Sequence, residues 1–126
     1  MNEEEENNMQ AAKQHHWHKL CKRGDLVANS GVCARFGQEQ VALFYVPGAT
    51  TNDDALYALS NRDPIGKANV MSRGLLGDIG GALVVASPLY KEHYKLATGE
   101  CLEDDSFRLQ VYPVRLEGDE VLIGGC

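Results

Sequence analysis

The sequence of 126 residues predicts an all-β fold, an antiparallel sandwich or barrel. Two observations favour this class. Short apolar runs rich in Val, Leu, Phe and Tyr recur along the chain, and turn residues separate them. Hydrophobic residues make up 44% of the chain, enough for one core, and chains of this length usually form one domain. We therefore expect a single domain over residues 15–126.

The first half begins with a polar segment and continues with four strand candidates. Residues 1–14 include an acidic run from Glu3 to Glu6 and little apolar mass, so we expect a disordered tail. The segment from Gly37 to Glu39 predicts a hairpin between the second and third strands. Pro47 and Gly48 end the third strand, and residues 50–54 are expected to form a loop. The four candidates are residues 17–21, 31–36, 40–45 and 55–59.

The second half begins with a long predicted loop over residues 61–81, which six glycines and prolines interrupt. Long loops inside compact domains are usually functional. The turn at residues 117–120 predicts a closing hairpin, and no internal repeat is apparent. The strand candidates after the loop are residues 83–86, 94–96, 107–112, 114–116 and 121–123.

Charge and hydropathy exclude several functions. The formal net charge is −6, and no basic patch stands out, which argues against a nucleic-acid partner. No apolar run approaches the roughly 18 residues that cross a membrane. The acidic N-terminus does not resemble a signal peptide, so a cytoplasmic location is expected.

Side chains that could carry chemistry do not form a convincing site. A metal site needs three or four ligands that converge on one point. We do not expect this of His15, His16, His18 and Cys21, and we interpret this segment as the exposed start of the domain. Ser87 with His93 lacks the Gly-x-Ser-x-Gly nucleophile elbow, so a loop hydroxyl that caps backbone groups is expected. We interpret the cysteines at positions 21, 33, 101 and 126 as mostly buried or inert thiols, with surface reactivity most plausible at position 126. The glycines at positions 74, 77, 80 and 81 are expected to supply positive φ angles in a tight loop. The acids at positions 100, 103, 104 and 105 are expected to form a solvated turn.

One frame in the chain resembles a metal site. It consists of Ser60-Asn61-Arg62-Asp63-Pro64-Ile65, then Val85-Ala86-Ser87-Pro88-Leu89-Tyr90, then Tyr94-Lys95-Leu96-Ala97-Thr98-Gly99-Glu100. This layout resembles the Rieske family, in which Cys-x-His and Cys-x-x-His loops hold a two-iron, two-sulfur cluster. The resemblance implies a Rieske-like fold with a loop subdomain at about residues 61–105. It places the four ligand positions at Asp63, Ile65, Ser87 and Tyr90. None of them is Cys or His, which are the ligands such a cluster requires.

The resemblance extends to a narrower family. The segments "Ser-Pro-Leu", "Thr-Gly-Glu-Cys-Leu-Glu-Asp" and "Tyr-Pro-Val-Arg" occur in the order and spacing found in small subunits of bacterial NAD(P)H nitrite reductases. The likeness spans residues 17–124. It implies a non-catalytic subunit in nitrate and nitrite assimilation, with no cofactor, catalytic residue or metal site of its own. FAD, siroheme and an iron–sulfur cluster are then expected on the partner, the large subunit.

The resemblance also suggests where that partner binds. In Rieske proteins the two ligand loops form an exposed tip that faces the partner. Here that tip should carry Asp63, Pro64, Arg73, Tyr90 and Lys91. Without a cluster, side chains must hold the loops together, and those expected to be buried or to fill the space are Leu75, Leu76, Leu83, Val84, Val85 and Leu89. Two alternatives stay open, a Rieske-type ferredoxin with unusual ligands and a stand-alone protein-binding module.

Overall fold

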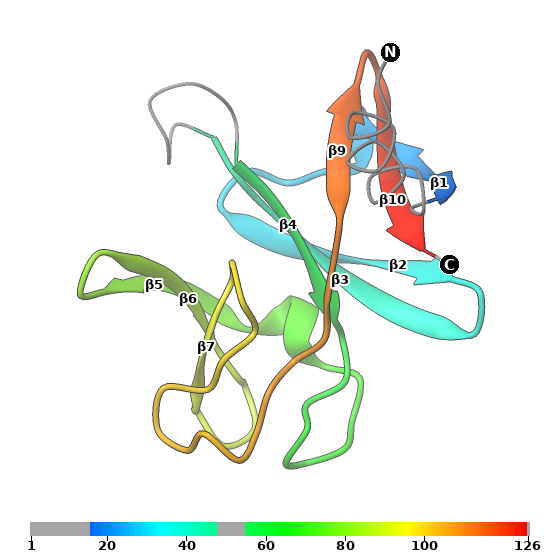
Figure 1. The fold of residues 1–126 in the computed structure, drawn as a ribbon. Helices are drawn as coiled ribbons and strands as arrows, with labels where there is room; N and C mark the ends of the chain where they lie inside the picture. Colours follow the sequence, from blue (N-terminus) through cyan, green and yellow to red (C-terminus); the bar gives the residue numbers. More distant parts are fainter. Residues whose placement is uncertain (1–15, 48–54, 126) are drawn as a thin grey trace, which may run out of the picture.

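The computed structural model describes residues 16–47 and 55–125 of the chain (Figure 1). The predicted tail, the predicted loop at residues 50–54 and Cys126 lie outside these residues. The elements, in chain order and with two short 3₁₀ helices, are β1 (His16–Lys22), η1 (Arg23–Asp25), β2 (Ser30–Phe36), β3 (Glu39–Val46), β4 (Ala55–Ser60), η2 (Met71–Arg73), β5 (Leu75–Ile79), β6 (Ala82–Ala86), β7 (His93–Lys95), β8 (Val111–Tyr112), β9 (Val114–Glu117) and β10 (Glu120–Gly125).

Antiparallel pairing joins the strands into three sheets. Their strand orders are β1–β10–β9, β2–β3–β4–β8 and β5–β6–β7. The predicted all-β antiparallel class is therefore confirmed. Strands β1 to β4, β6, β7, β9 and β10 lie within two residues of the predicted bounds. The hairpin at Gly37 is confirmed as well, because Phe36 pairs with Glu39 and Gly37 has φ +65°.

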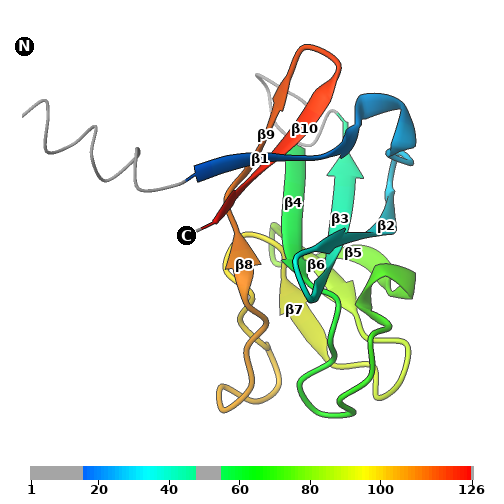
Figure 2. The same ribbon diagram turned by 90° about the vertical axis from the view of Figure 1, so that its right-hand side faces the viewer.

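The four-stranded sheet contributes to two cores because strand β3 is buried on both faces. Residues 41–44, Val-Ala-Leu-Phe, have no exposed surface. Val41 and Leu43 pack in one core with strand β10, and Ala42 and Phe44 pack in the other with strands β6 and β7. The two three-stranded sheets thus pack on opposite faces of the four-stranded sheet (Figure 2). A continuous apolar run is typical of such a doubly covered strand.

The predicted loop over residues 61–81 is wrong in its second half. That part contains helix η2 and strand β5, and β5 pairs with β6 from Leu75–Ala86 to Ile79–Ala82. The hairpin turns through Gly80 and Gly81, whose φ angles of +60° and +86° suit a two-residue turn of this kind. Gly77 interrupts the apolar pattern of β5, and this edge strand buries little, so its sequence resembles a loop.

The predicted strand over residues 107–112 is also mostly wrong. Only Val111–Tyr112 forms a strand, where it pairs with Leu59 and Ala58 of β4. Upstream of this strand, Arg108 forms only an isolated β-bridge with Glu100. Phe107 and Leu109 alternate with polar residues because they pack against the core, and they belong to no strand of the structure.

Candidate functional site

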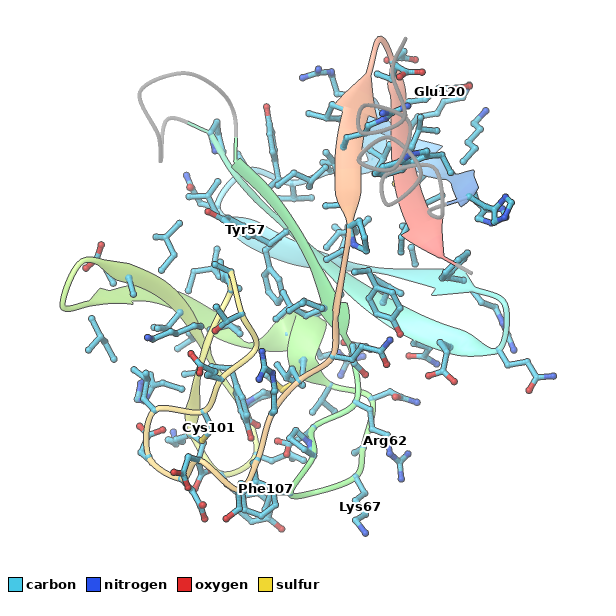
Figure 3. The ribbon with its side chains drawn as sticks, viewed as in Figure 1. Tyr57, Arg62, Lys67, Cys101, Phe107 and Glu120 are labelled. Carbon is cyan, nitrogen blue, oxygen red and sulfur yellow. The ribbon has the colours of Figure 1, made fainter. Side chains whose placement is uncertain are left out.

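Two loops at one end of the molecule occupy the positions that the sequence frame singled out. Loop 1 (residues 61–70) joins β4 to η2, and loop 2 (residues 87–92) joins β6 to β7. We call the two loops together the tip. In Figure 3, Arg62 and Lys67 mark loop 1 at the opposite end of the molecule from Glu120 in the β9–β10 hairpin.

Asn61 fixes the start of loop 1 to the central sheet. Its side chain is 2% exposed, and its Nδ2 donates to the side-chain oxygen of Gln40 at 3.0 Å and to Sγ of Cys33 at 3.5 Å. Its Oδ1 accepts the N–H of Ser72 at 2.6 Å, so the same residue also holds helix η2. Sequence reasoning treated this Asn only as part of a loop frame, because its partners lie far away in the chain.

The two loops have the same main-chain hydrogen bonding. In loop 1 the N–H of Lys67 donates to the carbonyl of Asp63 at 2.7 Å, and in loop 2 the N–H of Lys91 donates to the carbonyl of Ser87 at 3.0 Å. Lys67 and Lys91 both adopt the left-handed conformation, with φ +60° and +67°. The N–H groups of Asp63 and Ser87 close the loops by donating to the carbonyls of Ala68 and Glu92 respectively. A short structural repeat that sequence analysis missed therefore runs from Asp63-Pro-Ile-Gly-Lys67 to Ser87-Pro-Leu-Tyr-Lys91.

Side chains at the first position of each repeat join the loops. Oδ1 of Asp63 accepts the N–H groups of Ile65 at 2.8 Å and Gly66 at 3.0 Å. The hydroxyl of Ser87 donates to Oδ2 of Asp63 and accepts the N–H of Leu89 at 3.2 Å. Asp63 is 0% exposed and Ser87 is 2% exposed. The expected capping role of the Ser87 hydroxyl agrees with these contacts, and both oxygens of the Asp63 carboxylate are occupied.

The residues at the four ligand positions do not fit an iron–sulfur cluster. Asp63 and Ser87 bond to each other and to loop N–H groups, and Ile65 has no donor atom. Tyr90 offers a phenol on a side chain that is 58% exposed. A two-iron cluster requires thiolate or imidazole ligands at these positions, and the residues provide one carboxylate and two hydroxyls. We therefore derive no chemistry through such a cluster.

A buried tyrosine lies beneath the joined loops. Tyr94 is 0% exposed, and its hydroxyl has no hydrogen-bond partner among the residues that the structure describes. Burial raises the pKa of Tyr94 far above its usual range, and the nearby Asp63, Cys101 and Glu92 raise this pKa further. The phenol therefore stays neutral, and Tyr94 belongs to the core under the loops.

Ser87 and His93 have different partners, which removes the basis for a nucleophile. The Ser87 hydroxyl is bound to Asp63, whereas Nδ1 of His93 lies 2.6 Å from Oε2 of Glu103. The His93 N–H also donates to Oε1 of Glu103 at 2.8 Å. Burial opposes ionisation of Glu103, but the two bonds and the charge of His93 outweigh it and lower the pKa of Glu103. This contact ties the predicted acidic turn to strand β7.

Two of the residues predicted on the exposed surface of the tip are not there. Asp63 is buried, so its predicted place on an exposed surface is wrong, because its carboxylate is needed inside the tip. Arg73 belongs to η2, which packs on β2 and β3 and lies outside both loops. Pro64 is half-buried, and Tyr90 and Lys91 are exposed, as predicted.

The predicted packing between the loops is only partly correct. Val84 and Val85 are buried, and Leu76 and Leu83 are half-buried against the core. Leu75 is 77% exposed, because it points away from the core on the edge strand, and Leu89 is 43% exposed. The positive φ predicted for Gly74 and Gly77 is wrong, whereas Gly80 and Gly81 have it. A Cβ at Gly74 would lie 2.4 Å from the Ala86 carbonyl oxygen, so close packing requires this glycine.

The remaining candidate ligands do not converge. His16 and His18 are exposed on β1, and His15 lies outside the described residues. Across residues 16–47 and 55–125, no three His, Cys, Asp or Glu side chains lie close enough to hold a metal ion. Cys101 is buried, and burial and Asp25 raise the pKa of the half-buried Cys21. Cys33 is exposed.

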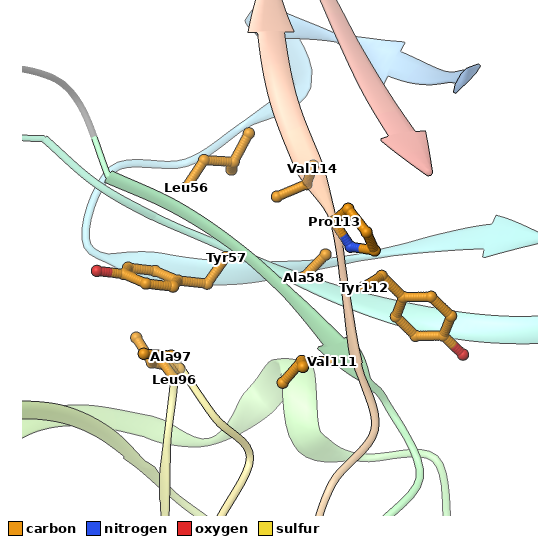
Figure 4. A pocket seen from close by; sticks show the side chains of 9 residues that line it. All are labelled: Leu56, Tyr57, Ala58, Leu96, Ala97, Val111, Tyr112, Pro113 and Val114. Atoms are coloured by element: carbon orange, nitrogen blue, oxygen red, sulfur yellow. The ribbon is translucent and has the colours of Figure 1, made fainter. Parts of the chain in front are cut away.

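An open groove of about 530 Å³ lies between β4, the turn after β7 and the β8–β9 segment (Figure 4). Its walls are apolar apart from Tyr57 and Tyr112, whose rings point in different directions in Figure 4. Burial, with a smaller effect of Glu39, raises the pKa of Tyr112, so this phenol is neutral. The lining residues provide no acid–base pair or activated nucleophile for catalysis.

Known proteins are similar to this chain in both fold and sequence. Residues 16–124 match the family described as "Rieske-like [2Fe-2S] domain". The chain is 40% identical over 109 residues to the nitrite reductase (NADH) small subunit of Salmonella typhimurium, a match that covers 86% of this chain and 97% of that protein. The solution structure of the nitrite reductase [NAD(P)H] small subunit of Erwinia carotovora is 38% identical, with a TM-score of 0.71 over 87% of this chain and 82% of the other.

Two further comparisons bear on the fold and on the assembly. The ferredoxin of carbazole 1,9a-dioxygenase from Nocardioides aromaticivorans is 18% identical, with a TM-score of 0.70 over 87% of this chain and 98% of the other, and shows the fold alone. The nitrite reductase [NAD(P)H] large subunit of Klebsiella oxytoca is 38% identical over 108 residues, which are 86% of this chain and 11% of that protein. By the family match and by identity over nearly the whole length of a relative, the chain belongs to the Rieske-like family and, within it, to the nitrite reductase (NADH) small subunits.

Proposed function

We propose that this chain is the non-catalytic small subunit of a cytoplasmic NAD(P)H-dependent nitrite reductase, which reduces nitrite to ammonia in nitrate and nitrite assimilation. Its partner is the large subunit, which we expect to carry FAD, siroheme and an iron–sulfur cluster. The observation that carries the non-catalytic role is the hydrogen bond between Asp63 and Ser87. It joins the two loops at positions where a cluster-bearing relative would need metal ligands.

The supporting role follows from how the tip is held. The buried Asp63 carboxylate accepts three hydrogen bonds, which fix loop 1 and link it to loop 2. Asn61 then fixes loop 1 to the central sheet. Because these contacts order the loops without a metal, the tip is a preformed surface, and binding to it loses little conformational entropy.

The large subunit of Klebsiella oxytoca supports a direct association. A segment similar to this chain makes up 11% of that protein, so a segment of this kind and the rest of the large subunit form one polypeptide there. When two proteins occur fused, their separate counterparts are expected to bind each other. We therefore place the partner of this chain in the large subunit rather than in an unrelated protein.

The tip is the surface that we propose for this contact. Tyr90 is 58% exposed and follows Leu89, which is 43% exposed, so an aromatic and an aliphatic side chain project together. Pro64 and Lys91 flank them on the two loops. Tyrosine is enriched among the residues that dominate protein interfaces, since it combines contact area with a polar group.

The alternatives have less support. A Rieske-type ferredoxin would need cluster ligands that Asp63, Ile65, Ser87 and Tyr90 do not provide. A stand-alone binding module would not account for the identity to nitrite reductase small subunits over 97% of a relative. Within the described residues, no helix has the length and apolar character needed to cross a membrane.

Titration of the purified large subunit with this chain tests the proposal. We expect a stoichiometric complex for the wild type, and a loss of more than about 1 kcal/mol in binding free energy for Tyr90→Ala. Glu120→Ala, at the far end of the molecule, is the control and should bind as the wild type does. Absence of any complex with the wild type would contradict the subunit assignment. Equal affinity of all three proteins would contradict only the docking surface.

A further inference from the structure

The exposed cations of the tip have no carboxylate partners within the described parts of the chain. Arg62, Lys67 and Lys91 are exposed, and no ion pair involves them. Lys22, Arg35, Arg73 and Arg108 are also exposed without an ion pair among the described residues, whereas three other surface cations are paired with carboxylates. Their bonds are Lys19 to Glu120 at 3.3 Å, Lys95 to Glu100 at 3.8 Å and Arg115 to Glu117 at 2.9 Å. The tip is thus a place where positive charge is left uncompensated on the surface.

The distribution of acids makes the tip positive on a negative chain. The whole chain has a net charge of −6. Residues 61–70 and 87–92 contain three exposed cations and two acids, the buried Asp63 and the half-buried Glu92. The Asp63 carboxylate is 0% exposed and its two oxygens accept bonds from the loops, so it does not present negative charge at the surface.

The repeat in the two loops places two of these cations at equivalent positions. Lys67 and Lys91 each have a left-handed backbone, which costs an ordinary residue about 1–2 kcal/mol and is more common for Gly or Asn. The loops lie side by side, because a Cβ on Gly66 would be 2.6 Å from Cδ1 of Leu89 and 3.1 Å from Cε2 of Tyr90. The tip therefore combines a pair of matched lysines with an exposed apolar centre.

We propose that the tip binds an acidic surface of the partner subunit, with Arg62, Lys67 and Lys91 facing its carboxylates and Leu89 and Tyr90 between them. This inference rests on the proposed function and adds the chemistry of the partner's surface. Uncompensated surface cations at a contact accelerate association with an acidic partner and fix its orientation. Three cations on a chain of net charge −6 are too few for a nucleic-acid backbone.

The test uses a double variant that removes charge and keeps the backbone. Asn tolerates the left-handed conformation, so Lys67→Asn/Lys91→Asn should fold as the wild type does, with an unchanged unfolding midpoint. The matched control is Lys22→Gln/Arg35→Gln, which removes two exposed cations outside the tip. Affinity for the purified large subunit is measured for each full-length chain from about 0.05 M to about 0.5 M NaCl.

We expect the tip variant to bind about tenfold more weakly at low salt, with a shallower dependence of affinity on salt, and the control to match the wild type. If the wild type and the tip variant bind equally, the inference is wrong and the subunit assignment stands. If the control weakens as much as the tip variant, net charge alone acts and the inference is again wrong. If the wild type does not bind at all, the proposed function and the inference both fail.

Discussion

The hydroxyl of Ser87 donates a hydrogen bond to Oδ2 of Asp63, and this bond joins the two loops of the tip inside the protein. Both side chains are almost completely buried. In a cluster-bearing relative the metal would tie the same loops together and contribute to folding. Here a carboxylate–hydroxyl pair holds the loops, so the fold of the tip depends on side chains that sequence comparison alone marks as lost ligands.

Ser87→Ala should destabilise the protein by about 1–3 kcal/mol, because it leaves a buried carboxylate oxygen without its donor. Urea unfolding of the wild type and the variant gives the difference in free energy of unfolding. Ser106→Ala, at an exposed position in the turn after Cys101, is the control and should stay within about 0.5 kcal/mol of the wild type. Equal stability of Ser87→Ala and the wild type would show that the bond does not hold the loops.

Two neighbouring leucines should respond differently to truncation. Leu76 packs against the core, whereas Leu75 is 77% exposed on the same strand. Full burial gives a cost of about 2–5 kcal/mol for Leu→Ala, so the half-buried Leu76 should cost about 1–2 kcal/mol. Leu75→Ala should change the unfolding free energy by less than about 0.5 kcal/mol. Similar losses for both would contradict the alternation of faces along β5.

The strands were predictable where local pattern and packing agree. The run Val41-Ala42-Leu43-Phe44 is apolar throughout because both faces of β3 are covered. Strand β5 was not predictable, because Gly77 interrupts it and only Leu76 packs against the core. The two adjacent leucines also look alike in sequence, and only the register with β6 decides which one faces the core.

The contacts inside the candidate site were not predictable from the sequence. The family frame pointed to the two loops, but a charged residue is expected at the surface, and Asp63 is buried because Ser87 and two N–H groups surround it. The repeat in the loops was not predictable from the sequence, because its two copies share only the second and fifth residues, a proline and a lysine. Its common feature is the main-chain bonding, which sequence letters do not show.

The contact between His93 and Glu103 should make stability depend on pH. The pKa of Glu103 lies below its ordinary value in the folded protein, so the carboxylate contributes stability above its unfolded pKa of about 4.3. That contribution is lost as the pH falls from about 4.3 through the folded pKa. Unfolding free energies at neutral and acidic pH should therefore show the wild type above Glu103→Gln only at neutral pH. The same difference at both pH values would contradict this account.

The purified chain should be colourless and should not assemble a cluster. Asp63 and Ser87 offer oxygens that are already bound, and Ile65 offers no donor. After anaerobic incubation with iron and sulfide, we expect no visible absorption band and no stoichiometric iron. Two irons per chain with the matching electron paramagnetic resonance signal would contradict the assignment of these four positions.

The most direct test of the central claim is nitrite-dependent NAD(P)H oxidation by the large subunit, measured with and without this chain. We expect the chain alone to be inactive, and its stoichiometric addition to raise the activity or the active lifetime of the large subunit. The added effect should saturate at the concentration at which the complex forms, because the chain acts by binding. Activity of the isolated chain, or a large subunit whose rate and lifetime are unchanged by it, would contradict the account.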